Sequence, residues 1–149
     1  MKIITRTLLV CAIFCYSLTS NAQILSSTKS SLFSGVASSF KAAIPELDKA
    51  FLVKEGSTVQ LQLTNNFVFG GTILSSVQRY GKLSSIIVKS ASLHNTVLAL
   101  SKRINDDNSI TYVGRIVNES YADGYQLNKN TDGTYTFNKI KSEDILQDY

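Results

Sequence analysis

The stretch from Leu83 to Val117 constrains the fold most, because it predicts three consecutive strands joined by short polar links. The expected strands are Leu83–Ser90, Asn95–Arg103 and Ser109–Val117. In the last of them apolar residues alternate with others, as in Ile110-Thr111-Tyr112. A period of two residues is typical of strands that bury one face and expose the other. The stretch therefore predicts an antiparallel meander.

Further strands are expected on both sides of this centre. The alternation predicts them at Thr58–Leu63, Phe67–Val77, Gly124–Asn128 and Thr134–Ile140. Turn-forming residues separate these runs, as in Asp132-Gly133. We expect a mainly β chain of about seven strands, an antiparallel meander curled into a half-barrel or small sandwich. A flat sheet would leave edges that favour aggregation.

The segment before the strands predicts a helix. Residues 23–39 are rich in serine, and Leu32, Phe33, Val36 and Phe40 have helical spacing. We expect a helix near Lys29–Ala43, with a flexible N-terminal arm that docks through the two phenylalanines as the alternative. Pro45 is then expected to start a short helical turn. The expected division of the chain is a leader (1–22), an N-terminal helical or docking segment (23–56) and an antiparallel β domain (57–149).

The first 22 residues have the pattern of a secretory signal peptide. Lys2 and Arg6 form a basic start, and Leu8–Leu18 is an apolar run. Small residues at Ser20 and Ala22 predict cleavage before Gln23. The run is shorter than the roughly 20 residues that a spanning helix needs. We therefore expect a secreted or periplasmic protein that meets a membrane only through an uncleaved leader. Exported proteins without cysteine, as this one would be after cleavage, are more usual in bacteria.

Cleavage would change both the cysteine content and the charge. Cys11 and Cys15 both lie in the leader, so the mature chain would have no disulfide and no thiolate metal site. Removal of the 22-residue leader leaves 127 of the 149 residues. Because the leader contains Lys2 and Arg6, its removal lowers the formal net charge from +4 to +2. The remaining basic residues are scattered, and this pattern argues against nucleic-acid binding.

Three candidate chemical sites lack the partners that their chemistry needs. His94 is the single histidine, without the further ligands of a zinc site or the nucleophile of a triad. Asp106 and Asp107 are adjacent in a turn, whereas glycoside hydrolysis needs carboxylates across a cleft. The run from Asn128 to Gly133 resembles the start of a calcium loop, but Lys139 takes the place of the required glutamate. The sequence predicts a protein that is not an enzyme, with no cofactor and no metal.

The aromatic residues have two interpretations. One is that alternating aromatics fill the core of the sheet, which we favour for Tyr112, Tyr125, Tyr135 and Phe137. The other is an exposed face that recognises a glycan or peptide. Two glycines within a strand mark a bulge, a bend or a close backbone approach. The candidate partner-binding residues are Gly70, Gly71, Tyr80, Gly114, Tyr121 and Tyr125.

Short motifs from Phe67 to the end of the chain resemble a known family. They are Phe69-Gly70-Gly71-Thr72, Ser75-Ser76-Val77-Gln78, Leu98-Ala99-Leu100-Ser101, Tyr112-Val113-Gly114-Arg115-Ile116, Tyr135-Thr136-Phe137-Asn138-Lys139 and Gln147-Asp148. This region is similar to the β-rich pro-segments of secreted bacterial reprolysin-like metallopeptidases. The chain has no zinc-binding helix and no cysteine near its end. The resemblance thus implies a stand-alone relative of a pro-segment that binds a protease or another exported partner.

Two functions remain from the sequence. The first is an exported, non-enzymatic β module that binds a protein partner through a sheet edge or face, with a bared edge expected at Gly114 and at the Gly70-Gly71 bend. The alternative is a glycan-binding or envelope-associated module that uses exposed tyrosines. In the alternative, Tyr80, Tyr121 and Tyr125 would gather on the surface.

Overall fold

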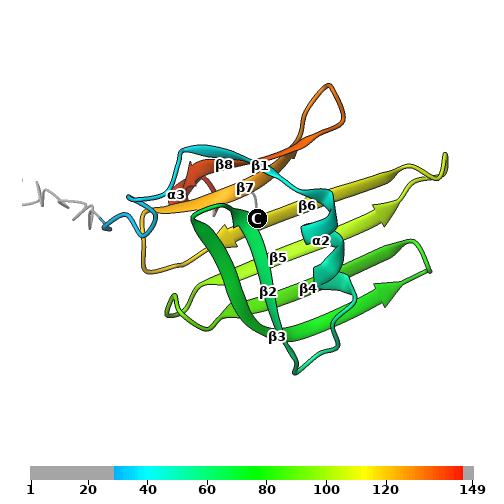
Figure 1. Ribbon diagram of the computed structural model, residues 1–149, viewed down its shortest axis with the longest axis horizontal. Coiled ribbons are helices and arrows are strands. Elements are labelled where there is room, and N and C mark those ends of the chain that lie inside the picture. The colour runs from blue at the N-terminus through cyan, green and yellow to red at the C-terminus, as the bar shows by residue number, and fades with distance from the viewer. Residues whose placement is uncertain (1–28, 146–149) are drawn as a thin grey trace, which may run out of the picture.

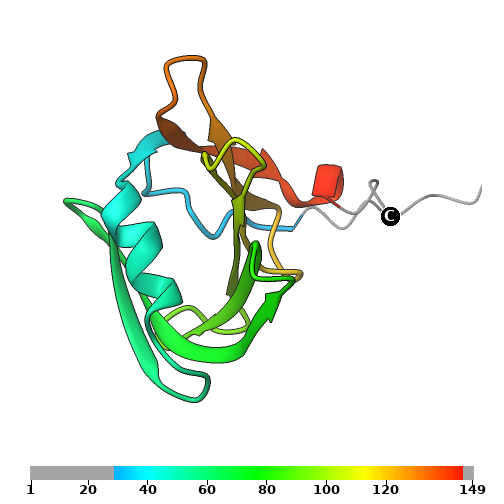
Figure 2. The same cartoon turned by 90° about the vertical axis from the view of Figure 1, so that its right-hand side faces the viewer.

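The computed structural model describes residues 29–145, which contain one antiparallel sheet of eight strands curled into a half-barrel (Figures 1 and 2). The strand order is β1-β8-β7-β6-β5-β4-β3-β2, so each strand from β2 to β8 lies beside its neighbour in sequence. The strands are β1 (Ser39–Ala42), β2 (Thr58–Thr64), β3 (Phe67–Arg79), β4 (Leu83–Ser90), β5 (Val97–Ile104), β6 (Ile110–Val117), β7 (Asp123–Lys129) and β8 (Tyr135–Lys141). The helices are α2 (Ile44–Phe51) and α3 (Ser142–Ile145).

The seven expected strands are all present within two residues of their predicted bounds, and β4 has the predicted bounds themselves. The mainly β prediction is confirmed. The eighth strand, β1, was not expected: it pairs antiparallel with β8, as in Phe40 opposite Phe137. The leader, both cysteines and the cleavage site lie outside the described residues.

The helix expected near Lys29–Ala43 is wrong. Residues 29–38, here called the strap, run without helix along the sheet and lead into β1. Apart from a turn bond from the Val36 amide to the Phe33 carbonyl, their backbone bonds go to other parts of the fold instead of to a helix. The buried Asp123 carboxylate accepts from the Leu32 amide at 2.6 Å and the Phe33 amide at 3.2 Å. Tertiary contacts override the helical spacing, because serine is a weak helix former.

One part of the alternative for this segment, docking through the two phenylalanines, is confirmed. Phe33 is buried, and its ring contacts Phe67 and Tyr125. Phe40 packs its ring against Tyr125 and Phe137. The strap is therefore part of the core, and its apolar spacing reflects this packing.

The helix that does form, α2, covers the open side of the curled sheet. Pro45 lies in its first turn, and Ala43 before it is extended. Its buried residues are Leu47 and Ala50. Glu46 accepts the Gln62 amide of the edge strand β2 at 2.8 Å. The helix thus protects an edge that would otherwise present an unpaired donor.

The core lies inside the curl and is rich in aromatic rings. Tyr112, Tyr125, Tyr135 and Phe137 are all buried, as predicted. Tyr112 and Tyr135 meet edge to face with ring centroids 5.4 Å apart. The Tyr125 hydroxyl donates to the Ala37 carbonyl of the strap at 2.6 Å. Each buried hydroxyl has a polar partner at the rim of the core, as expected for tyrosine.

The Gly70-Gly71 pair allows a close backbone approach. A Cβ at Gly71 would collide with the Lys89 carbonyl of β4. The register shifts of β3 fall elsewhere: one lies between Ile73 and Ser75, and one lies opposite the pair Gln62/Thr64 of β2. Close approach, one of the three predicted roles of the glycines, is the role that Gly71 has.

Candidate interaction face

The outward side of the four central strands forms a regular lattice of side chains. The pairing of β3, β4, β5 and β6 aligns their outward positions in four rows, here called the outer face. The rows are Arg79-Leu83-Arg103-Thr111, Val77-Ser85-Ser101-Val113, Ser75-Ile87-Ala99-Arg115 and Thr72-Lys89-Val97-Val117. None of these residues is buried.

Apolar side chains are prominent on the outer face. Val77, Ile87 and Val113 are 42%, 40% and 59% exposed, and Leu74, the extra residue at the β3 register shift, is 50% exposed. Single exposed apolar residues are ordinary, but a contiguous group is informative. Between them lie small residues, including Ser85 and Ser101, whose hydroxyls bond to each other at 2.8 Å. The middle of the outer face thus combines exposed apolar side chains with small side chains and is low in relief.

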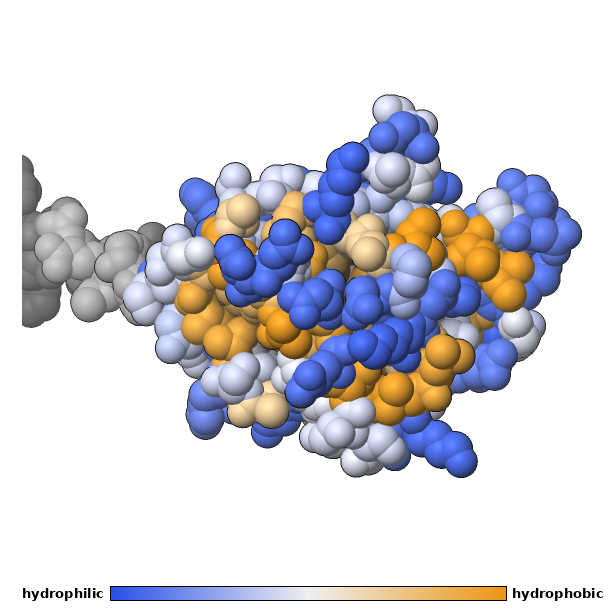
Figure 3. Space-filling view, viewed as in Figure 1, coloured by the Kyte–Doolittle hydropathy of each residue, from blue (hydrophilic) through white to orange (hydrophobic). Residues whose placement is uncertain are grey.

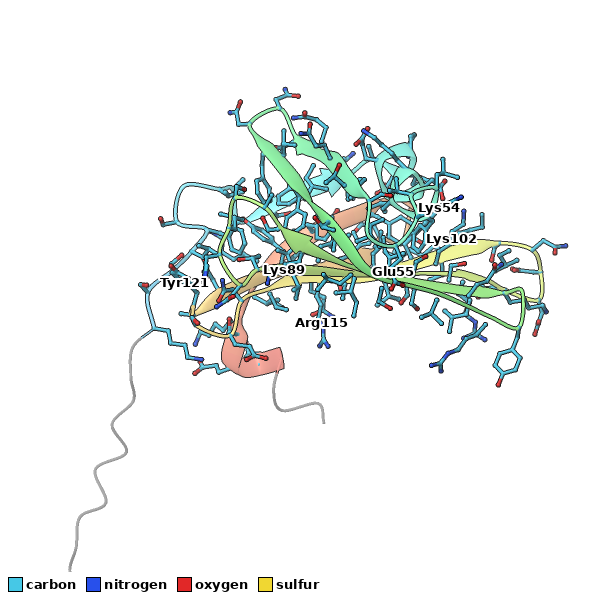
Figure 4. All side chains as sticks on the ribbon, turned by 90° about the horizontal axis from the view of Figure 1, so that it is seen from below. Lys54, Glu55, Lys89, Lys102, Arg115 and Tyr121 are labelled. Carbon is cyan, nitrogen blue, oxygen red and sulfur yellow. The ribbon has the colours of Figure 1, made fainter. Side chains whose placement is uncertain are left out.

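The charges on the outer face have one sign. Its charged residues are Arg79, Lys89, Arg103 and Arg115, and no row contains an aspartate or glutamate. Figure 4 shows Arg115 pointing away from the sheet on the side opposite Lys102. Arg79, Lys89 and Arg103 belong to none of the four ion pairs found among residues 29–145, which involve Lys49, Lys82, Lys102 and Lys141.

Tyr80 lies at the end of the outer face, in the turn between β3 and β4. It is 97% exposed, and its φ of 53° is positive. Gly81 also has a positive φ, and the Lys82 amide donates to the Arg79 carbonyl at 3.2 Å. This pattern fits a two-residue turn in which both central residues need positive φ, a role in which asparagine and glycine are preferred. A bulky tyrosine there costs stability, so its exposed ring requires another explanation.

The opposite side of the molecule, which carries α2, differs from the outer face. Figure 3 shows its hydrophobic patches interrupted by hydrophilic side chains. Asp48 of α2 accepts from the Lys102 ammonium at 2.6 Å and the Tyr112 hydroxyl at 2.7 Å. Burial raises the pKa of Asp48, but these two hydrogen bonds outweigh it and hold the pKa below its ordinary 3.8. On this side Asp48, Lys102 and Tyr112 therefore use one another as hydrogen-bond partners.

The three tyrosines proposed for a glycan face do not gather on the surface. Tyr125 is fully buried in the core, and burial, with the nearby Asp123 charge, raises its pKa to about 12. Tyr80 and Tyr121 follow opposite ends of the sheet, because the turn after β3 and the link after β6 lie at different ends. Figure 4 places Tyr121 at one end of the molecule.

The sheet edge expected at Gly114 is wrong. Gly114 is in β6, a central strand, and pairs with Leu100 on one side and Leu127 on the other. A Cβ at Gly114 would lie 2.8 Å from the Leu100 Cδ1 atom, so glycine here makes room for packing. Gly71 pairs with Val59 of β2 and with Ser90 of β4, and Gly70 pairs with Gln60 of β2, so neither glycine lies on a bare edge. The edges of the sheet are β1 and β2.

The candidate chemical sites lie in exposed turns. His94 and Asp106-Asp107 are exposed. The stretch that resembles a calcium loop is the turn between β7 and β8, where Asp132 accepts from the Thr134 amide at 2.9 Å. Within residues 29–145 no three His, Cys, Asp or Glu side chains group as metal ligands. The same part of the chain contains no helix long and apolar enough to cross a membrane.

Sequence reasoning named Tyr80 but missed most of the outer face. Its signal was present: in β4, Ile86-Ile87-Val88 is a continuous apolar run, so one of its members must face outward. Which outward residues become neighbours depends on strand register, including the shift at Leu74. No family model matches this sequence, and neither a curated protein nor a solved structure matches it.

Proposed function

We propose that this chain is an exported, non-enzymatic module that binds a protein partner through the outer face. The observation that carries the proposal is a set of exposed apolar side chains, Val77, Ile87 and Val113, here called the apolar centre, on three of the four strands of the outer face. An apolar centre with a polar rim is typical of protein–protein interfaces.

Tyr80 supports the same proposal. Tyrosine is enriched among the residues that dominate binding energy. Here the chain holds a fully exposed ring in a backbone conformation that disfavours it. Strain of this kind is often retained where it serves binding.

The resemblance to metallopeptidase pro-segments supplies one class of partner, an exported protease. The test is a pull-down with Gln23–Tyr149 as bait against the proteins exported by the source cell. Val113→Glu places a charge in the apolar centre, and Gln60→Glu places the same charge on β2, outside the outer face. Thermal unfolding first shows that both variants fold.

We expect a protein that the wild-type and Gln60→Glu baits retain and the Val113→Glu bait loses. A zinc-protease domain in that protein would support the pro-segment resemblance. Equal retention by all three baits would remove the outer face as the binding site. Retention of polysaccharide alone would favour the glycan-binding alternative and end the proposal.

A further inference from the structure

The arrangement of charge on the outer face indicates what the partner presents. Its four basic residues lie among the apolar ones: Arg79 and Arg103 lie in the row nearest Tyr80, Arg115 shares the row of Ile87, and Lys89 lies in the last row. Acidic residues of the described chain lie in α2, α3, the loops and turns, or at the buried Asp123. The rows of the outer face thus carry only positive charge, although α3, with Glu143 and Asp144, lies on the same side of the sheet as Arg115 (Figure 4).

We propose that the partner is a protein surface that presents carboxylates among apolar side chains. This inference rests on the proposed function and names the chemistry of its partner. Positive charge on one side of an interface favours a partner with negative charge on the other, through attraction during approach and rejection of basic surfaces.

Two features favour a protein over an anionic membrane as the occupant. Arg79 and Arg103 are arginines, whose planar guanidinium groups bind carboxylates with two parallel hydrogen bonds. The apolar residues are short aliphatic side chains in the middle of a sheet. Peripheral membrane binding instead uses amphipathic helices rich in lysine, with protruding apolar residues.

The inward Lys102 is an example of a basic side chain whose partners lie within the same chain. It meets Asp48 and lies within 5.8 Å of the Tyr112 ring centre. Arg79, Lys89 and Arg103 take part in none of the ion pairs of residues 29–145. These three side chains are exposed and open to carboxylates from outside.

The experiment measures binding of labelled ten-residue peptides to Gln23–Tyr149 by fluorescence anisotropy. The probe alternates glutamate with valine, and matched peptides replace each glutamate with glutamine or lysine. We expect the glutamate peptide to bind best and to weaken as salt rises, because exposed charges are screened. Arg103→Gln should weaken it about two- to fivefold, the range for an exposed charge pair.

Lys41→Gln is the matched control, since Lys41 is a basic residue of β1 outside the outer face. It should leave the affinity unchanged. Equal binding of the glutamate and glutamine peptides, or equal effects of Arg103→Gln and Lys41→Gln, would overturn the inference. So would binding to phosphatidylglycerol vesicles without binding to the glutamate peptide. If the pull-down yields a partner sensitive to Val113→Glu while the peptide fails, the proposed function stands and only the acidic partner is rejected.

Discussion

Ile86 and Ile87 are neighbours on β4, yet they face opposite environments. Ile86 is 2% exposed and lies in the core, opposite Leu100 of β5. Ile87 is 40% exposed and lies on the outer face, opposite Ala99. The inner side is closed by the strap and α2, whereas the outer face leaves apolar side chains in contact with water.

This difference teaches that the same apolar residue type has two roles in one strand. Burial of an aliphatic side chain stabilises the fold by about 1.5–3 kcal/mol, so Ile86 is explained by folding alone. Ile87 gains little from the folded chain. Its exposure is one of the observations behind the binding role that we propose for the outer face.

The largest expected effect contrasts these two isoleucines directly. Ile86→Ala should lower the free energy of unfolding by about 2–5 kcal/mol, because it opens a cavity in the core. Ile87→Ala should cost about 1 kcal/mol or less, since its side chain is only partly buried. Urea denaturation measures both, and equal losses would break the distinction between the two sides.

The next effect concerns the strap, which closes the inner side. Asp123 accepts from two strap amides and from the Ser31 hydroxyl. Asp123→Asn replaces one acceptor oxygen with a donor, so we expect a loss of about 1–3 kcal/mol and faster proteolysis of the strap. Glu119→Gln, at an exposed loop position, is the control. A stable, protease-resistant Asp123→Asn protein would show that the strap is held by Phe33 packing instead.

A smaller effect with the opposite sign is expected at the end of the outer face. Tyr80→Asn puts a residue that tolerates positive φ into the turn and should stabilise the protein by up to about 1 kcal/mol. The same change should weaken partner capture in the pull-down. Gain of stability with unchanged capture would assign Tyr80 no part in binding.

The smallest effect is the pH dependence of the polar contact between α2 and the inner side. The pKa of Asp48 is held below 3.8 in the folded chain, so its stabilisation is present above that pH and is lost as pH falls through the lowered value. Asp48→Asn should cost less than about 1 kcal/mol near neutral pH. The difference from wild type should shrink below pH 3.8, and a difference independent of pH would contradict this role.

The sequence predicted the strands well because their signals are local. Alternation along Leu83–Ser90 and the turn residues at Asp132-Gly133 both act within a few residues. The same reasoning failed for the strap, where Phe33 and Phe40 have helical spacing but pack against Tyr125. It also failed for Gly114, because the residues of a strand do not by themselves show whether it lies at the edge or in the centre of a sheet.

Local chemistry in the sequence thus determined the strand class, the turns and the aromatic core, since each depends on near neighbours in the chain. Tertiary structure alone decided that β1 closes onto β8, that α2 covers the gap, and that Val77, Ile87 and Val113 share one face of the sheet. The physical reason is register. Hydrogen-bond pairing across strands, with a shift at Leu74, sets which distant residues share the outer face.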